Sequence, residues 1–141
     1  MKILIKTPIE NDYRSVFSRF NMKLFAALKP PFVNLRIDRF DGCKKGDEVH
    51  LQVAGQRWVS HITELHEDEN QIYFVDIGVI IPPPLTSWRH VHRIERAGKN
   101  KCHVIDDIEY STGNKITDKL LYPAIMAMFL LRRPVYIREL S

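Results

Sequence analysis

Hydrophobic and polar residues alternate with a period of two through the middle of the chain, beginning with Val33, Leu35 and Ile37. Side chains of a β-strand point alternately to its two faces, so this period predicts half-buried strands. The segments with this pattern are 33–38, 48–53, 58–65, 72–77, 88–96 and 102–111. Short turns separate most of them, and neighbouring strands with such connections predict an antiparallel meander.

The period changes to that of a helix before this block. A short strand is expected over 2–6. A first helix is expected to begin at Thr7 or just after Pro8, because apolar residues follow at helical spacing up to Phe20. A second short helix carries Leu24, Phe25 and Leu28, and it must end at Pro30-Pro31 because proline disfavours helix in the residue before it.

The C-terminal part predicts one long helix from about 116 to 133. It carries two apolar stripes, one of Ile116, Leu120, Ala124, Ala127, Met128 and Leu131, the other of Leu121, Ile125 and Phe129. A helix that is apolar on two sides is expected to be covered on two sides, which a curved sheet can do. The apolar run 120–131 is too short for a bilayer, which needs about 20 residues, so we expect no stable membrane insertion.

Composition narrows the class of protein. A chain of 141 residues, 45% hydrophobic and 27% charged, fits one ordinary folded domain, 1–141. The net charge of +4 is spread in short clusters, so we expect no nucleic-acid partner.

The two cysteines form no CxxC pair and the N-terminus lacks a signal-peptide pattern, so we expect a cytoplasmic protein with reduced thiols. Lys44-Lys45 could lower the pKa of the neighbouring Cys43 thiol, but no histidine base is placed beside it.

Four segments together resemble a known superfamily. They are Thr7-Pro8-Ile9-Glu10, the W-x-H-x-H strand over 88–94, the D-x-I-x-Y pattern over 106–110 and the C-terminal Leu-Tyr-Pro…Phe-Leu-Leu-Arg-Arg segment. With this order of elements, the chain resembles a bacterial ligand-binding branch of the SRPBCC superfamily, which includes START lipid-transfer domains, birch-pollen-allergen-like proteins and polyketide cyclases.

The resemblance implies an α+β helix-grip fold over nearly the whole chain. In that fold, a curved antiparallel sheet of six to seven strands wraps around a long C-terminal helix, and two short helices lie between the first and second strands. The resemblance also implies a cavity between the sheet and the long helix. It implies no universal catalytic residue, since one fold hosts many activities.

The strand at 88–94 carries the most informative polar residues. Trp88, His90 and His92 share one face, while the other face carries three charged residues and is expected to meet solvent. In the last strand, Asp106 and Tyr110 share the face of Ile108. These two strands are expected to pair, which predicts an inward polar set of His90, His92, Asp106 and Tyr110. Such a set could orient a carbonyl, hydroxyl or carboxylate of a ligand.

Two other interpretations of this set stay open. The set could be a satisfied polar network in the core with no ligand role. His90 and His92 could instead bind a metal with Asp106 as third ligand. Glu95 lies on the opposite face of the strand, so a cupin-like HxH…E site is not supported, and we expect no metal and no cofactor.

The cavity is expected to be lined mainly by apolar residues of the inward strand faces and of the long helix. With the polar set, the predicted lining is Trp58, Phe74, Trp88, His90, His92, Asp106, Ile108, Tyr110, Leu120, Ala124 and Met128. Asp76 either joins the polar set or caps the turn at Gly78. The apolar loop 79–85, with its three prolines, either packs on the core or forms the rim of the cavity mouth.

These features favour a binding or carrier protein for an apolar small molecule such as a lipid, isoprenoid, quinone or polyketide. The first alternative is an enzyme of the cyclase or dehydratase kind, with His90 or His92 as general base oriented by Asp106. The second is a structural or interaction module whose pocket has collapsed, exposing an apolar patch near 79–85.

Overall fold

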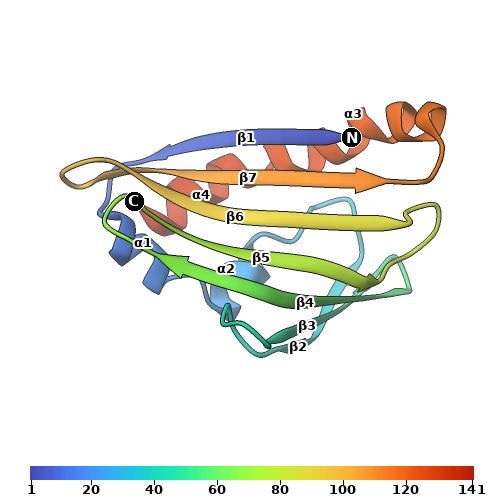
Figure 1. Cartoon of the computed structure of the whole chain (residues 1–141), viewed down its shortest axis with the longest axis horizontal. Coiled ribbons are helices and arrows are strands. Elements are labelled where there is room, and N and C mark those ends of the chain that lie inside the picture. Colours follow the sequence, from blue (N-terminus) through green and yellow to red (C-terminus); the bar gives the residue numbers. More distant parts are fainter.

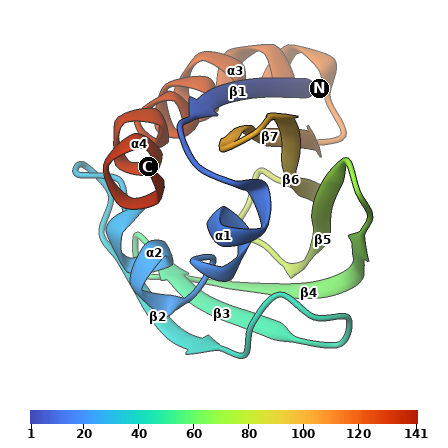
Figure 2. The same ribbon diagram turned by 90° about the vertical axis from the view of Figure 1, so that its left-hand side faces the viewer.

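Seven antiparallel strands form one strongly curved sheet in the order β1-β7-β6-β5-β4-β3-β2 (Figures 1 and 2). The computed structural model describes all residues, 1–141. Its strands are β1 (Lys2–Ile9), β2 (Leu35–Phe40), β3 (Glu48–Val53), β4 (Gln56–Glu67), β5 (Gln71–Ile80), β6 (Ser87–Gly98) and β7 (Lys101–Ser111). The α+β helix-grip fold is therefore confirmed, and the first strand, β1, lies at the edge of the sheet beside the last strand, β7.

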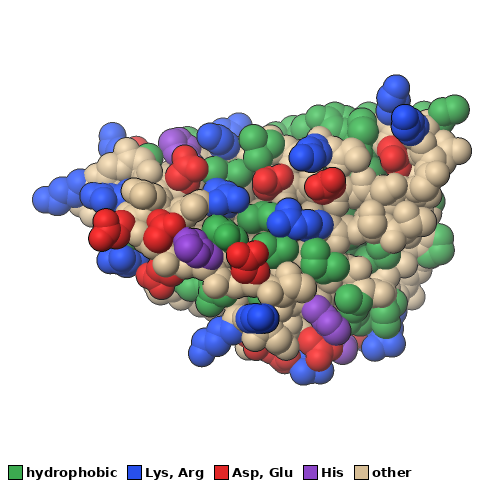
Figure 3. All heavy atoms as spheres, in the orientation of Figure 1, with side chains coloured by type: hydrophobic (Ala, Val, Ile, Leu, Met, Phe, Trp, Pro, Cys, Tyr) green, Lys and Arg blue, Asp and Glu red, His purple; other side chains and the backbone are tan.

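The strand faces follow the period of two in the sequence. Along β1, buried residues such as Ile3 and Ile5 alternate with exposed ones over the whole strand. On β6, Trp88, His90 and His92 are buried as expected. The outer face of the sheet carries basic and acidic side chains interspersed with one another (Figure 3).

Two short helices, α1 (Tyr13–Ser18) and α2 (Met22–Ala27), follow the first strand. The Asp12 side chain caps α1 by accepting from the backbone N–H groups of Arg14 and Ser15. The prediction that this helix starts near Thr7 is wrong because β1 continues to Ile9, paired with β7. Pro8 is tolerated there because β1 is an edge strand.

The C-terminal helix is longer than predicted and divided in two. Helix α3 spans Lys115–Leu130 and helix α4 spans Arg132–Leu140. The helix was predicted to end at about 133, but Pro134 occupies the first turn of α4, where a missing N–H breaks no helical hydrogen bond. Figures 1 and 2 show both helices running along the sheet beside β1.

The second apolar stripe of α3 faces the sheet, whereas of the first stripe only Met128 reaches the cavity. Phe129 of the second stripe is buried, and Leu121 and Ile125 pack with it, whereas Ile116 and Leu120 of the first stripe are 72% and 73% exposed. The expectation that the sheet covers both stripes is wrong, because the sheet passes along one side of the helix. The segment Lys115–Leu140 contains an 18-residue stretch with a mean hydropathy of 1.3, so by length and composition alone it could span a membrane.

Candidate functional site

A cavity of about 350 Å³ lies between the concave face of the sheet and α3. Most of its walls are apolar. Helix α3 contributes Leu121, Ile125 and Met128, and the connection between α2 and β2 contributes Pro30 and Val33. The loop 82–85 also contacts the cavity, so this apolar segment forms part of the wall. The predicted residues that line the cavity are Trp58, Phe74, Trp88, His90, His92 and Met128.

The other five predicted lining residues lie elsewhere. Asp106, Ile108 and Tyr110 are buried but lie outside the cavity wall, and the Tyr110 hydroxyl donates to the Asp118 carbonyl at 2.6 Å. Tyr110 therefore does not belong to the histidine cluster. Leu120 and Ala124 lie on the exposed side of α3, so their assignment to the cavity is wrong.

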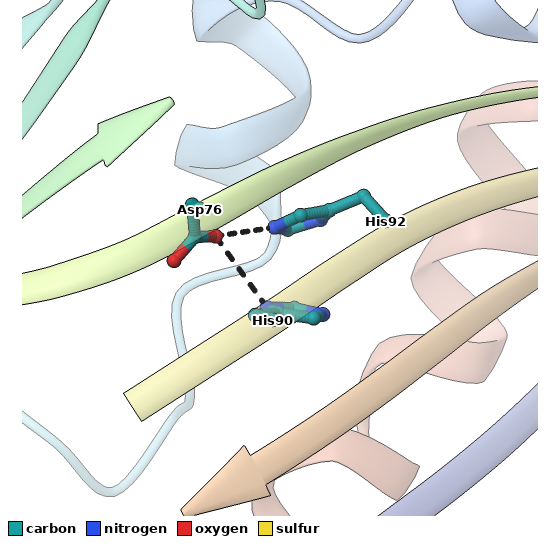
Figure 4. A group of neighbouring side chains, drawn as sticks. All are labelled: Asp76, His90 and His92. Atoms are coloured by element: carbon teal, nitrogen blue, oxygen red, sulfur yellow. Dashed lines mark hydrogen bonds and ion pairs between the residues drawn. The ribbon is translucent and has the colours of Figure 1, made fainter. Parts of the chain in front are cut away.

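Two histidines and Asp76 converge in the cavity wall (Figure 4). Asp76 on β5 pairs in register with His90 on β6, and His92 follows on the same face. The Nε2 of His92 lies 2.6 Å from Asp76 Oδ2, and the Nδ1 of His90 lies 3.7 Å from the same oxygen. Asp76 thus joins the polar set, which settles the choice that the sequence left open.

A second carboxylate lies behind His90. Asp106 Oδ1 is 2.9 Å from His90 Nε2, and the Tyr136 hydroxyl donates to the same oxygen at 3.3 Å. Arg132 Nη1 lies 3.7 Å away. The predicted pairing of a buried carboxylate with a histidine is therefore present. Neither Arg132 nor Tyr136 was predicted: Arg132 lies within the predicted helix but off both apolar stripes, and Tyr136 lies beyond the predicted end at about 133.

Aromatic rings fix the two imidazoles in place. The ring of Phe74 is stacked on His92 with centroids 4.3 Å apart, and His92 lies against His90 at 3.6 Å. Phe129 meets His90 edge to face at 5.2 Å. These contacts leave the two rings little freedom to rotate, so their nitrogen atoms keep the directions that the hydrogen bonds require.

Burial and charge set the protonation states of the cluster. Burial lowers the pKa of His92 to about 4, and the neighbouring His90 adds to the effect. Burial, the largest single effect, would raise the pKa of Asp76 and of Asp106, but the hydrogen bonds with His92 and His90 and the electrostatic effect of the neighbouring imidazole and guanidinium groups together lower both. At neutral pH both carboxylates are therefore ionised and His92 is neutral.

Arg132 brings a positive charge to the cavity wall. Its guanidinium carbon lies 4.3 Å from the centre of the Phe129 ring, and its only hydrogen bond is a long one of 3.5 Å to the Tyr136 hydroxyl. A guanidinium has five N–H donors. Most of those donors have no protein acceptor, so they are available to an acidic or carbonyl group of a ligand.

Cys43 has no part in this chemistry. Its side chain is buried against the core, and Sγ lies 3.6 Å from the Phe20 carbonyl. Burial raises the pKa of the Cys43 thiol to about 12, with a further contribution from Asp47. The expectation that Lys44-Lys45 lowers this pKa is wrong, because burial dominates.

Asp76, His90 and His92 are also the residues that could hold a metal ion, since their donor atoms lie within 4.8 Å of one another. The predicted alternative of Asp106 as third ligand is wrong. Asp106 contacts Nε2 of His90, whereas Asp76 lies on the Nδ1 side and contacts His92 as well.

Comparisons of structure bear on the fold. The chain is similar to a hypothetical protein from Helicobacter pylori (TM-score 0.74, 9% identity, covering 100% of this chain and 88% of that one). It is similar to norcoclaurine synthase from Thalictrum flavum, with a TM-score of 0.68 and 14% identity, covering 96% of this chain and 89% of that one. It is also similar to the ZhuI aromatase/cyclase from Streptomyces sp. R1128, with a TM-score of 0.68 and 12% identity, covering 96% of this chain and 90% of that one. No protein-family model and no curated protein sequence matches the chain. At these identities the likeness establishes the helix-grip fold alone.

Proposed function

We propose that this helix-grip protein binds an apolar small molecule with one acidic or carbonyl group in the cavity between the sheet and α3. The observation that carries the proposal is the distribution of polarity in the cavity wall. Most of the lining is apolar, and Asp76, His90, His92 and Arg132 form one connected polar cluster, with Lys29, Gln56 and Ser60 as the other polar side chains of the wall. Small-molecule sites of this kind combine apolar walls with a few polar groups that orient the ligand.

The size of the cavity supports the same proposal. Its volume of about 350 Å³ lies within the roughly 300–1,000 Å³ of small-molecule sites. A collapsed pocket would leave no such space. A lipid, isoprenoid, quinone or polyketide of modest size has both the apolar body and the oxygen-bearing end that this arrangement favours. The complex of norcoclaurine synthase with dopamine and hydroxybenzaldehyde provides a precedent for a small molecule bound to this fold.

Tryptophan fluorescence offers a direct test. The chain has two tryptophans, and both line the cavity with ring centroids 5.1 Å apart. Decanoic acid and 1-decanol serve as probes because they share an apolar chain and differ in the polar end. We expect both to change the fluorescence with saturation, and the acid to bind more tightly through Arg132.

A matched pair of variants isolates the polar end. Arg132→Met should weaken the binding of decanoic acid about tenfold, because one charge-assisted hydrogen bond is lost, and should leave the binding of decanol unchanged. Arg133→Met alters an exposed arginine outside the cavity wall and should bind both probes like the unmodified chain. The absence of saturable binding of either probe would contradict the proposal.

A second candidate function is catalysis of the cyclase or dehydratase kind. The observation that favours it is His90, an imidazole in a cavity wall with a buried carboxylate at its far nitrogen. Under this alternative, compounds released from the unmodified protein and from His90→Gln should differ chemically, as product and accumulated substrate. The same compound released from both would argue against catalysis.

A further inference from the structure

The histidine cluster brings three potential metal ligands together. The donor atoms of Asp76, His90 and His92 lie within 4.8 Å of one another, and Asp76 Oδ2 faces a nitrogen of each imidazole (Figure 4). A zinc ion needs such donors about 2.0–2.2 Å away. Binding an ion would move the Asp76 carboxylate away from His92 Nε2, now 2.6 Å distant, and toward His90 Nδ1, now 3.7 Å distant.

The hydrogen bond behind His90 determines which of its nitrogens is free. Nε2 of His90 lies 2.9 Å from the carboxylate oxygen Oδ1 of Asp106, which can only accept, so Nε2 is the nitrogen that donates. Nδ1, the other ring nitrogen, lies on the side of Asp76 and is the one available to a metal ion. A histidine that binds a metal usually donates its other N–H to a carboxylate or carbonyl group, which fixes the ring. Asp106 occupies that position.

We propose that Asp76, His90 and His92 form a site for a divalent first-row transition-metal ion, Zn²⁺ being the simplest occupant. Two imidazoles and one carboxylate are a donor set typical of such ions. All three ligands line the cavity, so further coordination positions open toward it. The acidic or carbonyl group of the proposed ligand would approach the ion there. The metal site uses the same cavity as the proposed function but can be tested without any ligand.

Co²⁺ is a suitable probe because its visible absorption reports coordination by nitrogen and oxygen. A competing surface set must first be removed, since His50 and His61 place Nε2 atoms 3.0 Å and 3.3 Å from Glu48 Oε1. The test protein therefore carries His50→Ala and His61→Ala and is dialysed against a chelator. We expect one Co²⁺ per chain with ligand-field bands, and displacement of Co²⁺ by Zn²⁺.

Two further substitutions in that background separate binding from folding. Asp76→Asn should weaken Co²⁺ binding at least 100-fold, and Asp106→Asn, which removes the charged partner of His90, should weaken it about 10–100-fold. Circular dichroism must show that each variant is folded. A folded test protein without Co²⁺ bands, or an Asp76→Asn variant that binds equally, overturns the inference. The binding of decanol is measured separately, with chelator present, and does not depend on a metal ion. A failure of the metal site can therefore be distinguished from a failure of the proposed function.

Discussion

Replacing Asp106 with asparagine tests whether the buried carboxylate holds the site together. Asp106 is 1% exposed, and its Oδ1 accepts hydrogen bonds from His90 at 2.9 Å and from Tyr136 at 3.3 Å. Asparagine keeps one acceptor oxygen but removes the charge that strengthens both bonds. Its amide group replaces Oδ2, which has no partner, and so adds a buried donor without an acceptor.

The magnitude follows from these contacts. A hydrogen bond to a charged group contributes about 1.5–3 kcal/mol, and a buried unsatisfied donor costs about 1–3 kcal/mol. Removal of a buried charge recovers part of this loss, because the carboxylate no longer has to be desolvated. We therefore expect Asp106→Asn to lower the free energy of unfolding by about 2–4 kcal/mol.

Urea unfolding at pH 7, followed by circular dichroism, measures this loss. Asp107→Asn is the matched control because Asp107 is the next residue on β7, points to the opposite face and makes no side-chain hydrogen bond or ion pair. Its effect should stay within about 0.5 kcal/mol. A loss below about 0.5 kcal/mol for Asp106→Asn, or equal losses for both variants, would refute the argument.

Three further predictions follow from burial. Leu121→Lys should lower the free energy of unfolding by at least about 2 kcal/mol in a urea titration, because Leu121 packs against the sheet. Leu120→Lys should change it by less than about 0.5 kcal/mol relative to the unmodified chain, because Leu120 is exposed. Ile125→Phe should fill part of the cavity and abolish the decanol-induced fluorescence change without loss of stability. Cys43 and Cys102, with pKa values raised to about 12 and about 11, should resist a thiol reagent at pH 8 until urea is added. Since unfolded thiols ionise near 8.5, protein stability should fall as the pH rises above that value; thiol labelling without urea would contradict their burial.

The sequence predicted the parts of the fold that depend on local periodicity. Strands 88–96 and 102–111 follow a period of two, and their predicted inward residues are buried, although Val91 and Ile105 on the opposite face are buried as well. The extent of the C-terminal helix was harder to predict, because Pro134 is compatible both with an end and with a first turn. The choice between the two apolar stripes of α3 depends on where the sheet passes, which no local pattern contains.

The candidate site was partly predictable for the same reason. His90, His92 and Asp106 share inward faces of paired strands, which the period of two revealed. Tyr110 lies on the correct face but too far along the strand, where Asp118 is its partner. Tyr136 reaches Asp106 from α4, a contact between residues 30 positions apart that depends on tertiary packing.

Native mass spectrometry tests the central claim most directly. The unmodified protein and Ile125→Phe are each incubated with decanoic acid and sprayed under non-denaturing conditions. The account predicts one decanoate per chain on the unmodified protein and the bare mass for Ile125→Phe, since the added ring occupies the cavity. A bare mass for both proteins, or equal decanoate on both, would contradict binding in the cavity between the sheet and α3.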